Sequence, residues 1–218
     1  MSAALRRAII AAARRMNELG INQGTSGNLS VRWGDGFLVT PSGMEYDSLK
    51  PSDIVTMDMA GRAKGARSPS SEWRIHRDIL ASRPEAGAVL HAHPPYATTL
   101  ACLGRGIPAF HYMVAMAGGD SIRCAPYATF GTEALSKAAL AALRGRRACL
   151  MANHGMVVFG RDLGHALRIA LEVETLAGQY WRALQIGRPK LLSKAEMKLN
   201  VEKFKTYGVQ PRRESRRP

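Results

Sequence analysis

The sequence predicts a single α/β domain in which helices flank a mixed or antiparallel sheet. Its 218 residues suffice for one domain with a substantial core, and a composition of 46% hydrophobic and 22% charged residues is typical of a globular protein. Segments with helical periodicity alternate along the chain with short apolar runs bounded by turn-forming residues. No internal repeat or low-complexity linker interrupts this pattern, which therefore favours one domain.

The first part of the chain predicts one helix followed by three strands. Apolar residues recur at steps of three and four in residues 3–19, which indicates an amphipathic helix, and Gly20 ends it. Residues 29–33 and 37–40 predict a hairpin around a Gly-Asp-Gly turn, and residues 54–59 predict a third strand.

The rest of the chain predicts further strands and helices in alternation. Short apolar runs indicate strands at residues 88–93, 148–152 and 156–159. Helices are expected at residues 71–82, from Pro95 onward, and at residues 132–144, 163–184 and 193–204. The last helix begins with a capping pattern, in which Ser193 is followed three residues later by Glu196.

The chain is strongly basic, and half of its formal net charge of +14 lies near the C-terminus. Residues 188–218 hold ten Lys or Arg and three Glu, a balance of +7. Residues 209–218 are predicted to form a basic, disordered tail. Aromatic residues are not interleaved with the basic ones, as a single-strand stacking surface requires, so we expect no nucleic-acid partner.

The cysteines indicate a reducing compartment. Cys102, Cys124 and Cys149 are scattered, odd in number, and form no Cys-x-x-Cys pair, so we expect free thiols and a cytoplasmic location. No apolar run approaches the roughly 18–20 residues that cross a bilayer, so we expect no membrane association.

Three histidines occupy positions typical of metal ligands. His91 and His93 end an apolar run, and because side chains alternate along a strand, both imidazoles should lie on one face. A transition metal would remove the cost of burying two imidazoles side by side, and neutral imidazole is its commonest nitrogen ligand. His154, in an Asn-His-Gly segment, is the third candidate, and Glu72 is the best candidate for a carboxylate ligand.

An alternative reading of these histidines needs no metal. His91 and His93 could be core residues that form ordinary hydrogen bonds. Two other histidines lie on expected helices and are predicted not to be ligands: His76 and His165.

Three loops of small residues are candidates for anion binding. They comprise residues 24–28, 40–43 and 68–71, and the last leads into a helix N-terminus. Hydroxyls and backbone N–H groups can bind a phosphate without a lysine. Neither G-x-x-x-x-G-K-[ST] nor a G-x-G-x-x-G motif opening a βαβ unit occurs, so a nucleotide-binding fold is not expected.

These motifs together resemble the class II aldolase/adducin family. The resembling segments are residues 19–28, 40–43, 69–74, 91–93, 107–113, 125–132, 153–155 and 202–208. The resemblance covers about residues 5–208. It implies one domain over residues 1–208, in which helices flank a central, mainly antiparallel sheet.

The resemblance also implies a site. One Zn²⁺ per subunit, with Co²⁺ or Mn²⁺ as substitutes, would be held by Glu72, His91, His93 and His154. The phosphate of a sugar substrate would be held by Gly27, Asn28, Ser42, Gly43, Ser70 and Ser71. Glu72 would also act as the base, Tyr112 would transfer a proton, and Phe130 and Tyr207 would bound the aldehyde side. The family's aldolase is a homotetramer with its site at a subunit interface.

The function implied is that of a zinc-dependent lyase of carbohydrate metabolism. Such an aldolase cleaves a ketose 1-phosphate, of the L-fuculose 1-phosphate type, to dihydroxyacetone phosphate and an aldehyde. A salvage aldolase for 5-deoxyribulose or 5-methylthioribulose 1-phosphate is a close alternative. A pentulose-phosphate 4-epimerase or a dehydratase of the same superfamily is another, but residues 110–116 lack the extra carboxylate expected of an epimerase. A non-enzymatic, adducin-like module is disfavoured by the retained metal ligands.

Overall fold

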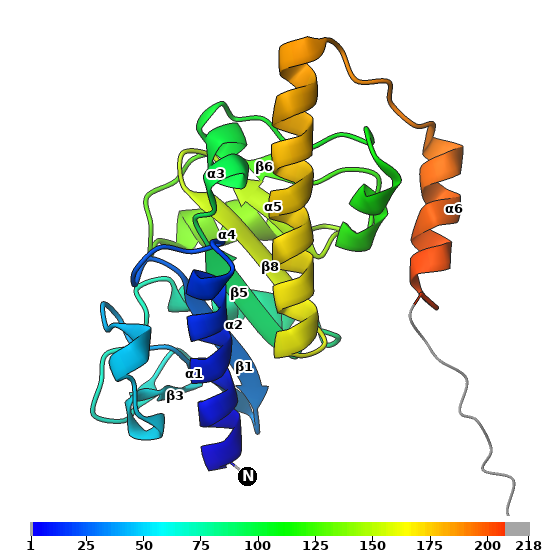
Figure 1. Ribbon diagram of the computed structural model, residues 1–218. Helices are drawn as coiled ribbons and strands as arrows, with labels where there is room; N and C mark the ends of the chain where they lie inside the picture. The colour runs from blue at the N-terminus through cyan, green and yellow to red at the C-terminus, as the bar shows by residue number, and fades with distance from the viewer. Residues whose placement is uncertain (1, 208–218) are drawn as a thin grey trace, which may run out of the picture.

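The structure, a computed structural model, describes residues 2–207. The predicted basic tail, residues 209–218, lies outside the described residues. Within them the chain forms one mixed, mostly antiparallel sheet with helices on both faces (Figure 1), as the sequence predicts. No helix of this part of the chain is both long and apolar enough to cross a lipid bilayer.

Eight strands make up the sheet of the described residues, in the order β4-β3-β2-β1-β5-β8-β7-β6. All neighbours pair antiparallel except β6 and β7, which are parallel. Their bounds are β1 Asn28–Trp33, β2 Gly36–Val39, β3 Val55–Asp58, β4 Ala63–Lys64, β5 Ala88–Ala92, β6 Arg123–Ala125, β7 Ala148–Met151 and β8 Gly155–Gly160. Six of these match predicted strands. The short edge strands β4 and β6 were not predicted, because two or three residues carry too little periodicity to be recognised.

The helices also follow the predicted pattern. Their bounds are α1 Ser2–Glu18, α2 Trp73–Ser82, α3 Pro95–Cys102, α4 Glu133–Ala142, α5 Leu163–Ile186 and α6 Lys194–Phe204. Short 3₁₀ helices, which were not predicted, occur at η1 Tyr46–Ser48, η2 Pro51–Asp53 and η3 Tyr112–Ala117. The predicted cap of the last helix is present, because Ser193 Oγ accepts a hydrogen bond from the Glu196 backbone N–H at 3.1 Å.

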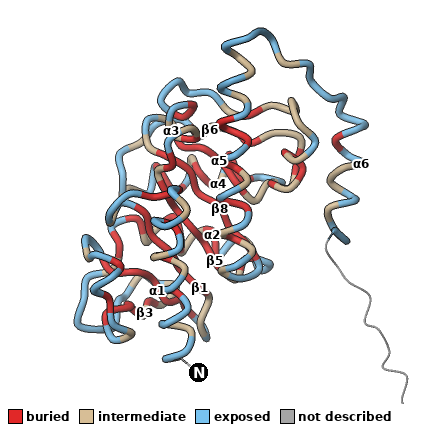
Figure 2. Tube along the Cα trace, viewed as in Figure 1, coloured by how far each residue is buried: buried red, intermediate tan, exposed pale blue. Residues whose placement is uncertain are grey.

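The sheet separates two hydrophobic cores. One core packs α1, α3 and α5 against one face, and the other packs α2 and α4 against the opposite face. The central strand β5 is buried on both sides (Figure 2), which explains its continuous apolar run. Because side chains alternate, Leu90 faces the first core and Val89 the second, so His91 points toward the α2 side.

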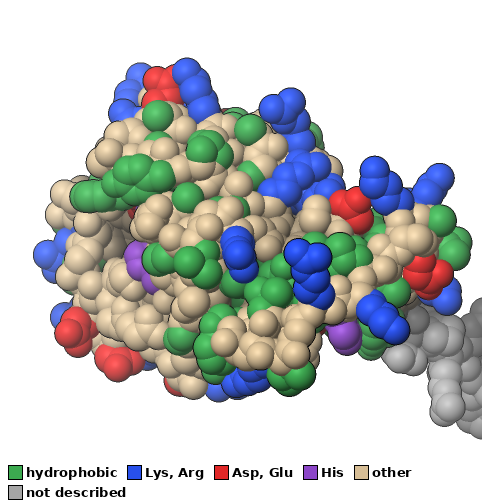
Figure 3. Space-filling view, turned by 90° about the horizontal axis from the view of Figure 1, so that it is seen from above, with side chains coloured by type: hydrophobic (Ala, Val, Ile, Leu, Met, Phe, Trp, Pro, Cys, Tyr) green, Lys and Arg blue, Asp and Glu red, His purple; other side chains and the backbone are tan. Residues whose placement is uncertain are grey.

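Helix α6 lies apart from these layers. It follows an extended segment after α5 and packs mainly on η3 (Figure 1). Met197 is its one buried residue. Lysine and arginine side chains gather on the side of the molecule that carries this helix (Figure 3).

Candidate functional site

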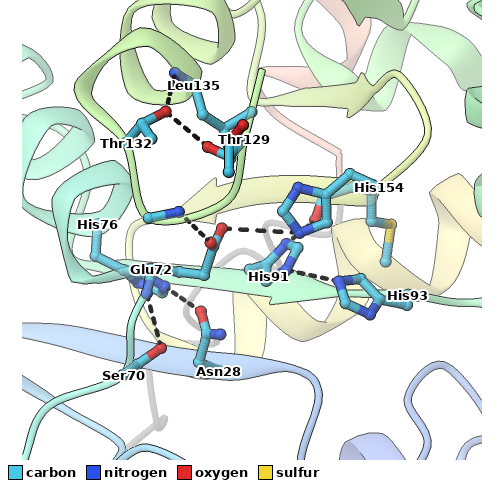
Figure 4. Close-up of polar contacts among 12 residues, drawn as sticks. Asn28, Ser70, Glu72, His76, His91, His93, Thr129, Thr132, Leu135 and His154 are labelled. Carbon is cyan, nitrogen blue, oxygen red and sulfur yellow. Dashed lines mark hydrogen bonds and ion pairs between the residues drawn. The ribbon is translucent and has the colours of Figure 1, made fainter. Parts of the chain in front are cut away.

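The three candidate histidines come together at one end of the central strands. His91 lies on β5, His93 directly follows that strand, and His154 lies in the turn between β7 and β8. Their ring centroids are 4.7–5.0 Å apart. One ring nitrogen from each lies within 4.8 Å of the others (Figure 4), a spacing that suits shared ligation of one metal ion.

The tight turn between β7 and β8 delivers His154 to this cluster. Asn153 has a φ of 53°, and among the described residues it is the only non-glycine residue with positive φ. Asparagine tolerates this left-handed conformation better than most side chains. Gly155 is required for the close approach of the strands, since a Cβ there would lie 2.6 Å from both the Ala92 carbonyl oxygen and His93 Cδ2.

Glu72, the residue immediately before α2, faces the histidines. Its Oε1 accepts a hydrogen bond from the Gly131 backbone N–H at 2.8 Å, and its Oε2 lies 3.8 Å from His154 Nε2. Oε2 is buried and has no hydrogen-bond partner. Burial raises the pKa of the Glu72 carboxyl, while the Gly131 N–H opposes that rise.

Burial keeps the three histidines neutral near pH 7. It lowers the pKa of His91 well below its usual value, lowers that of His93, and lowers that of His154 to about 4. His91 Nδ1 donates to the Met156 carbonyl oxygen at 2.8 Å, because a carbonyl can only accept. His91 Nε2 therefore carries a lone pair, as an imidazole nitrogen that binds a metal must. This atom lies 2.9 Å from His93 Nε2.

These four side chains fit a divalent metal. Three neutral imidazoles and one carboxylate form a donor set suited to catalytic zinc. The orphaned Glu72 Oε2 is the sharpest indication, since a buried carboxylate oxygen without a partner is costly unless a cation or proton satisfies it.

The candidate phosphate residues surround the same cavity, which has a volume of about 340 Å³. All six of them line it: Gly27, Asn28, Ser42, Gly43, Ser70 and Ser71. Backbone hydrogen bonds hold two of the loops together, from Ser42 N to the Ser68 carbonyl at 3.1 Å and from Ser70 N to the Thr40 carbonyl at 3.0 Å.

Of the aldehyde-side candidates, Phe130 lines the cavity and Tyr207 does not. Phe130 is 65% exposed and lies near Tyr127, which is 63% exposed and also lines the cavity. Tyr207 instead lines a second pocket, of about 250 Å³, together with Tyr112 and Phe204. We call these three residues the α6 aromatic patch. Tyr112 and Phe204 stack there with ring centroids 6.4 Å apart.

Sequence reasoning missed several residues at the cavity. Tyr127 stands inside the resembling segment 125–132, but nothing local marked it as a lining residue. The Gly131 N–H contact with Glu72 joins residues 59 positions apart and has no signal in the sequence. His76 and His165 do not join the cluster: His76 hydrogen-bonds to Asn28 and Ser30, and His165 Nδ1 accepts from the Arg161 N–H.

Comparisons with known proteins identify a family and several relatives of this chain. The family described as "Class II Aldolase and Adducin N-terminal domain" matches residues 7–181. The chain is 61% identical to the 5-methylthioribulose-1-phosphate/5-deoxyribulose-1-phosphate aldolase of Rhodospirillum rubrum, over 94% of this chain and 93% of that protein. It is 48% identical to the L-fuculose phosphate aldolase of Escherichia coli K12, over 94% of this chain and 96% of that protein. A solved structure of an L-fuculose 1-phosphate aldolase superposes with a TM-score of 0.91 at 42% identity, covering 94% of this chain and 98% of the other.

Proposed function

This chain belongs to the class II aldolase and adducin family and is a class II aldolase, and from that premise we propose that it cleaves a ketose 1-phosphate to dihydroxyacetone phosphate and an aldehyde. One observation carries the proposal. A buried, unpartnered Glu72 oxygen faces three neutral histidines in a cavity that is also lined by the small-residue loops. The proposal is supported because the candidate metal residues and the candidate phosphate residues line one and the same cavity.

The metal set would be Glu72, His91, His93 and His154, with Zn²⁺ as the proposed ion and Co²⁺ or Mn²⁺ as substitutes. A divalent ion bound there would supply Lewis-acid polarisation of the substrate carbonyl and stabilise the negative charge that develops beside it.

The chain's own groups would move two protons during cleavage. The bond between C3 and C4 breaks, the C4 hydroxyl loses its proton as the aldehyde forms, and C3 gains one. We assign the C4 hydroxyl proton to Tyr112 and the C3 proton to Glu72. Burial raises the pKa of the Glu72 carboxyl, which favours proton uptake by this group. The Gly131 N–H would keep its carboxylate directed into the cavity.

The phosphate would lie among the loops that contribute Gly27, Asn28, Ser42, Gly43, Ser70 and Ser71. Each offers a hydroxyl, an amide or a backbone N–H, and the loop over residues 68–71 leads into α2.

We place 5-deoxyribulose 1-phosphate and 5-methylthioribulose 1-phosphate first among the substrates. The sequence motifs favour L-fuculose 1-phosphate, whereas the 61% identity to the Rhodospirillum rubrum enzyme supports the opposite order. Tyr127, Ala128 and Phe130 give the cavity an apolar rim, which suits a methyl or methylthio end. L-Fuculose 1-phosphate stays the second candidate because of the 48% identity to the Escherichia coli enzyme.

Completion of the site would require a second copy of the chain. Tyr112 and Tyr207 lie in the α6 aromatic patch, which shares no lining residue with the cavity. We therefore propose a homotetramer in which the patch of one subunit borders the cavity of its neighbour. A cytoplasmic location is proposed on the three free cysteines, since disulfides are rare in reducing compartments.

The test is a cleavage assay of the metal-loaded protein with these three sugar phosphates and ribulose 1-phosphate. Release of dihydroxyacetone phosphate is the readout, and a chelator-treated sample is the control. Metal-dependent release supports the aldolase, and the ranking of kcat/KM identifies the substrate. Absence of release from all four would reject it and favour an epimerase or dehydratase, for which ribulose 5-phosphate is the next substrate.

A further inference from the structure

A chain of three buried polar side chains lies beside the cavity. Ser30 and Asn28 are two residues apart on β1, and His76 reaches both from α2. His76 Nδ1 lies 2.8 Å from Ser30 Oγ, and His76 Nε2 lies 2.6 Å from Asn28 Oδ1. Ser30 and His76 are fully buried, and Asn28 is 5% exposed.

The chemistry of the three groups sets the direction of these hydrogen bonds. Asn28 Oδ1 is a carbonyl oxygen and can only accept, so His76 Nε2 carries the hydrogen and donates it. Burial lowers the pKa of His76 to about 3, so the ring stays neutral and Nδ1 keeps a lone pair. Ser30 Oγ then donates to Nδ1. All the ring's hydrogen-bonding capacity is used, which explains how a histidine is accommodated at full burial.

This arrangement determines which end of the Asn28 amide is available to a ligand. Its oxygen turns toward His76 and its nitrogen turns away (Figure 4). Asn28 lines the cavity, and the amide nitrogen has no side-chain hydrogen bond within residues 2–207. The amide therefore presents two N–H donors, which suit an anion. The reversed amide would present a carbonyl oxygen, which repels one.

We propose that His76 is a positioning residue for phosphate recognition, because its Nε2 hydrogen bond holds the Asn28 carboxamide with the NH₂ group toward the cavity. This inference rests on the proposed function, in which Asn28 contacts the substrate phosphate. It gives the buried histidine, which is not a metal ligand, a role in substrate binding that acts entirely through Asn28.

The hydrogen bond between His76 and Asn28 also connects two parts of the proposed phosphate site. β1 carries Asn28, and α2 begins immediately after the loop that carries Ser70 and Ser71. His76 lies on the first turns of α2, so its bond to Asn28 sets the spacing between two groups of phosphate donors. Loss of the bond should weaken phosphate binding more than it slows the bond-breaking step.

The experiment compares His76→Leu, His76→Gln, Asn28→Ala and the double variant His76→Leu/Asn28→Ala. Inorganic phosphate is the probe in calorimetric titrations of the metal-loaded protein, and KM and kcat are measured with the best ketose 1-phosphate. His76→Leu should weaken phosphate binding and raise KM by roughly 10- to 100-fold, as expected for a lost hydrogen bond that supports a charged ligand. Its kcat should change by less than about threefold.

The double variant separates positioning from general damage. If His76 acts through Asn28, His76→Leu should add almost nothing to the defect of Asn28→Ala. His76→Gln, which can supply an N–H donor near the same place, should recover part of the affinity. Additive defects, or unchanged phosphate affinity in His76→Leu, would overturn the proposal.

A measurement on the unaltered protein covers the case in which His76→Leu does not fold. Long-range proton–nitrogen NMR correlations report which ring nitrogen carries the hydrogen. A neutral His76 protonated at Nε2 supports the proposal, and protonation at Nδ1 rejects it. If the unaltered protein binds phosphate but cleaves no ketose 1-phosphate, the proposed function fails while the binding data still decide the role of His76.

Discussion

The cavity and the α6 aromatic patch hold the candidate site residues in very different surroundings. In the cavity, Glu72 and His91 are buried and held by hydrogen bonds to the Gly131 N–H and the Met156 carbonyl. In the patch, Tyr112 at the start of η3 is 49% exposed, and Tyr207, which follows α6, is 77% exposed. The cavity is preorganised within one chain, whereas the patch presents large aromatic surface outward.

This difference suits two separate roles for the cavity and the patch. Metal and phosphate binding require fixed donors, and on the proposed function the central strands and the start of α2 would supply them. Clustered, exposed aromatic side chains are typical of surfaces that contact another molecule. We therefore expect variants in the cavity to act within their own subunit, and variants in the patch to act on a neighbouring subunit.

The largest effect is expected from Glu72→Gln. The amide keeps the size of the side chain but cannot exchange a proton, so kcat should fall by about 10³-fold. Turnover of the zinc-loaded variant and its metal content are the measurements. Glu133→Gln, an exposed glutamate paired with Lys137 on α4, is the matched control and should keep full activity. Near-normal turnover in Glu72→Gln would remove Glu72 as the base.

His93→Ala should cost the protein its metal. Its imidazole is one of three that converge within 4.8 Å, and its removal takes away one of the four proposed ligands, which should weaken zinc binding. Metal per chain after dialysis is the measurement, and His165→Ala, outside the cluster, should retain full occupancy. An undiminished zinc content in His93→Ala would contradict the ligand assignment.

Mixing two impaired variants tests the division between cavity and patch most directly. Tyr112→Phe should lower kcat by about 10²-fold, since the phenol can no longer transfer a proton. If Tyr112 serves the neighbouring subunit, Tyr112→Phe and His93→Ala subunits that exchange in the presence of zinc should form some sites with both groups intact.

Activity should therefore return on mixing, to a fraction of the original level. The control is a mixture of Glu72→Gln and His93→Ala subunits. Both changes affect the same cavity, so this mixture should stay inactive. No recovery in the first mixture would place Tyr112 and the cavity in one chain's site, or outside the site altogether.

A smaller effect is expected from Phe130→Ala at the rim of the cavity. Loss of one apolar contact should change the ratio of kcat/KM between 5-methylthioribulose and 5-deoxyribulose 1-phosphates by about tenfold. Phe204→Leu in the patch is the companion variant. Equal shifts in both variants would show that cavity and patch share the aldehyde end.

The smallest effect concerns stability and pH. The pKa of His76 falls from 6.5 to about 3 on folding. Between about pH 6.5 and pH 3, the His76 side chain is therefore protonated in the unfolded chain but neutral in the folded chain. This contribution to stability is fully present above pH 6.5 and declines as the pH falls through that window.

In the metal-free protein, His76→Gln should therefore reduce the slope of unfolding free energy against pH by up to about 1.4 kcal/mol per pH unit. Urea unfolding at pH 7, 6 and 5 measures it. Phe204→Leu, which removes no ionising group, should leave the slope unchanged. An identical slope in His76→Gln would contradict the depressed pKa.

Sequence patterns predicted much of the fold because they report local preferences. Gly20 and the apolar spacing before it place α1 within a residue or two of its observed bounds. The capping pattern at Ser193 is observed as a hydrogen bond. Strands β4 and β6 escaped prediction because their pairing partners, β3 and β7, define them more than their own residues do. The short helix η3 was not predicted either. It begins where His111 Nδ1 accepts a hydrogen bond from the Met113 backbone N–H.

The order of the elements, the His-x-His face and the loops of small residues could be predicted from the sequence, since each depends on neighbours within a few positions. Which buried polar atoms meet depends instead on the tertiary structure. Glu72 finds Gly131 across 59 residues, and His76 finds Asn28 across 48. It also separated Tyr112 and Tyr207 from the cavity. The physical reason is that burial and hydrogen-bond partnership depend on how distant segments pack, and no local pattern encodes the far partner of a buried polar atom.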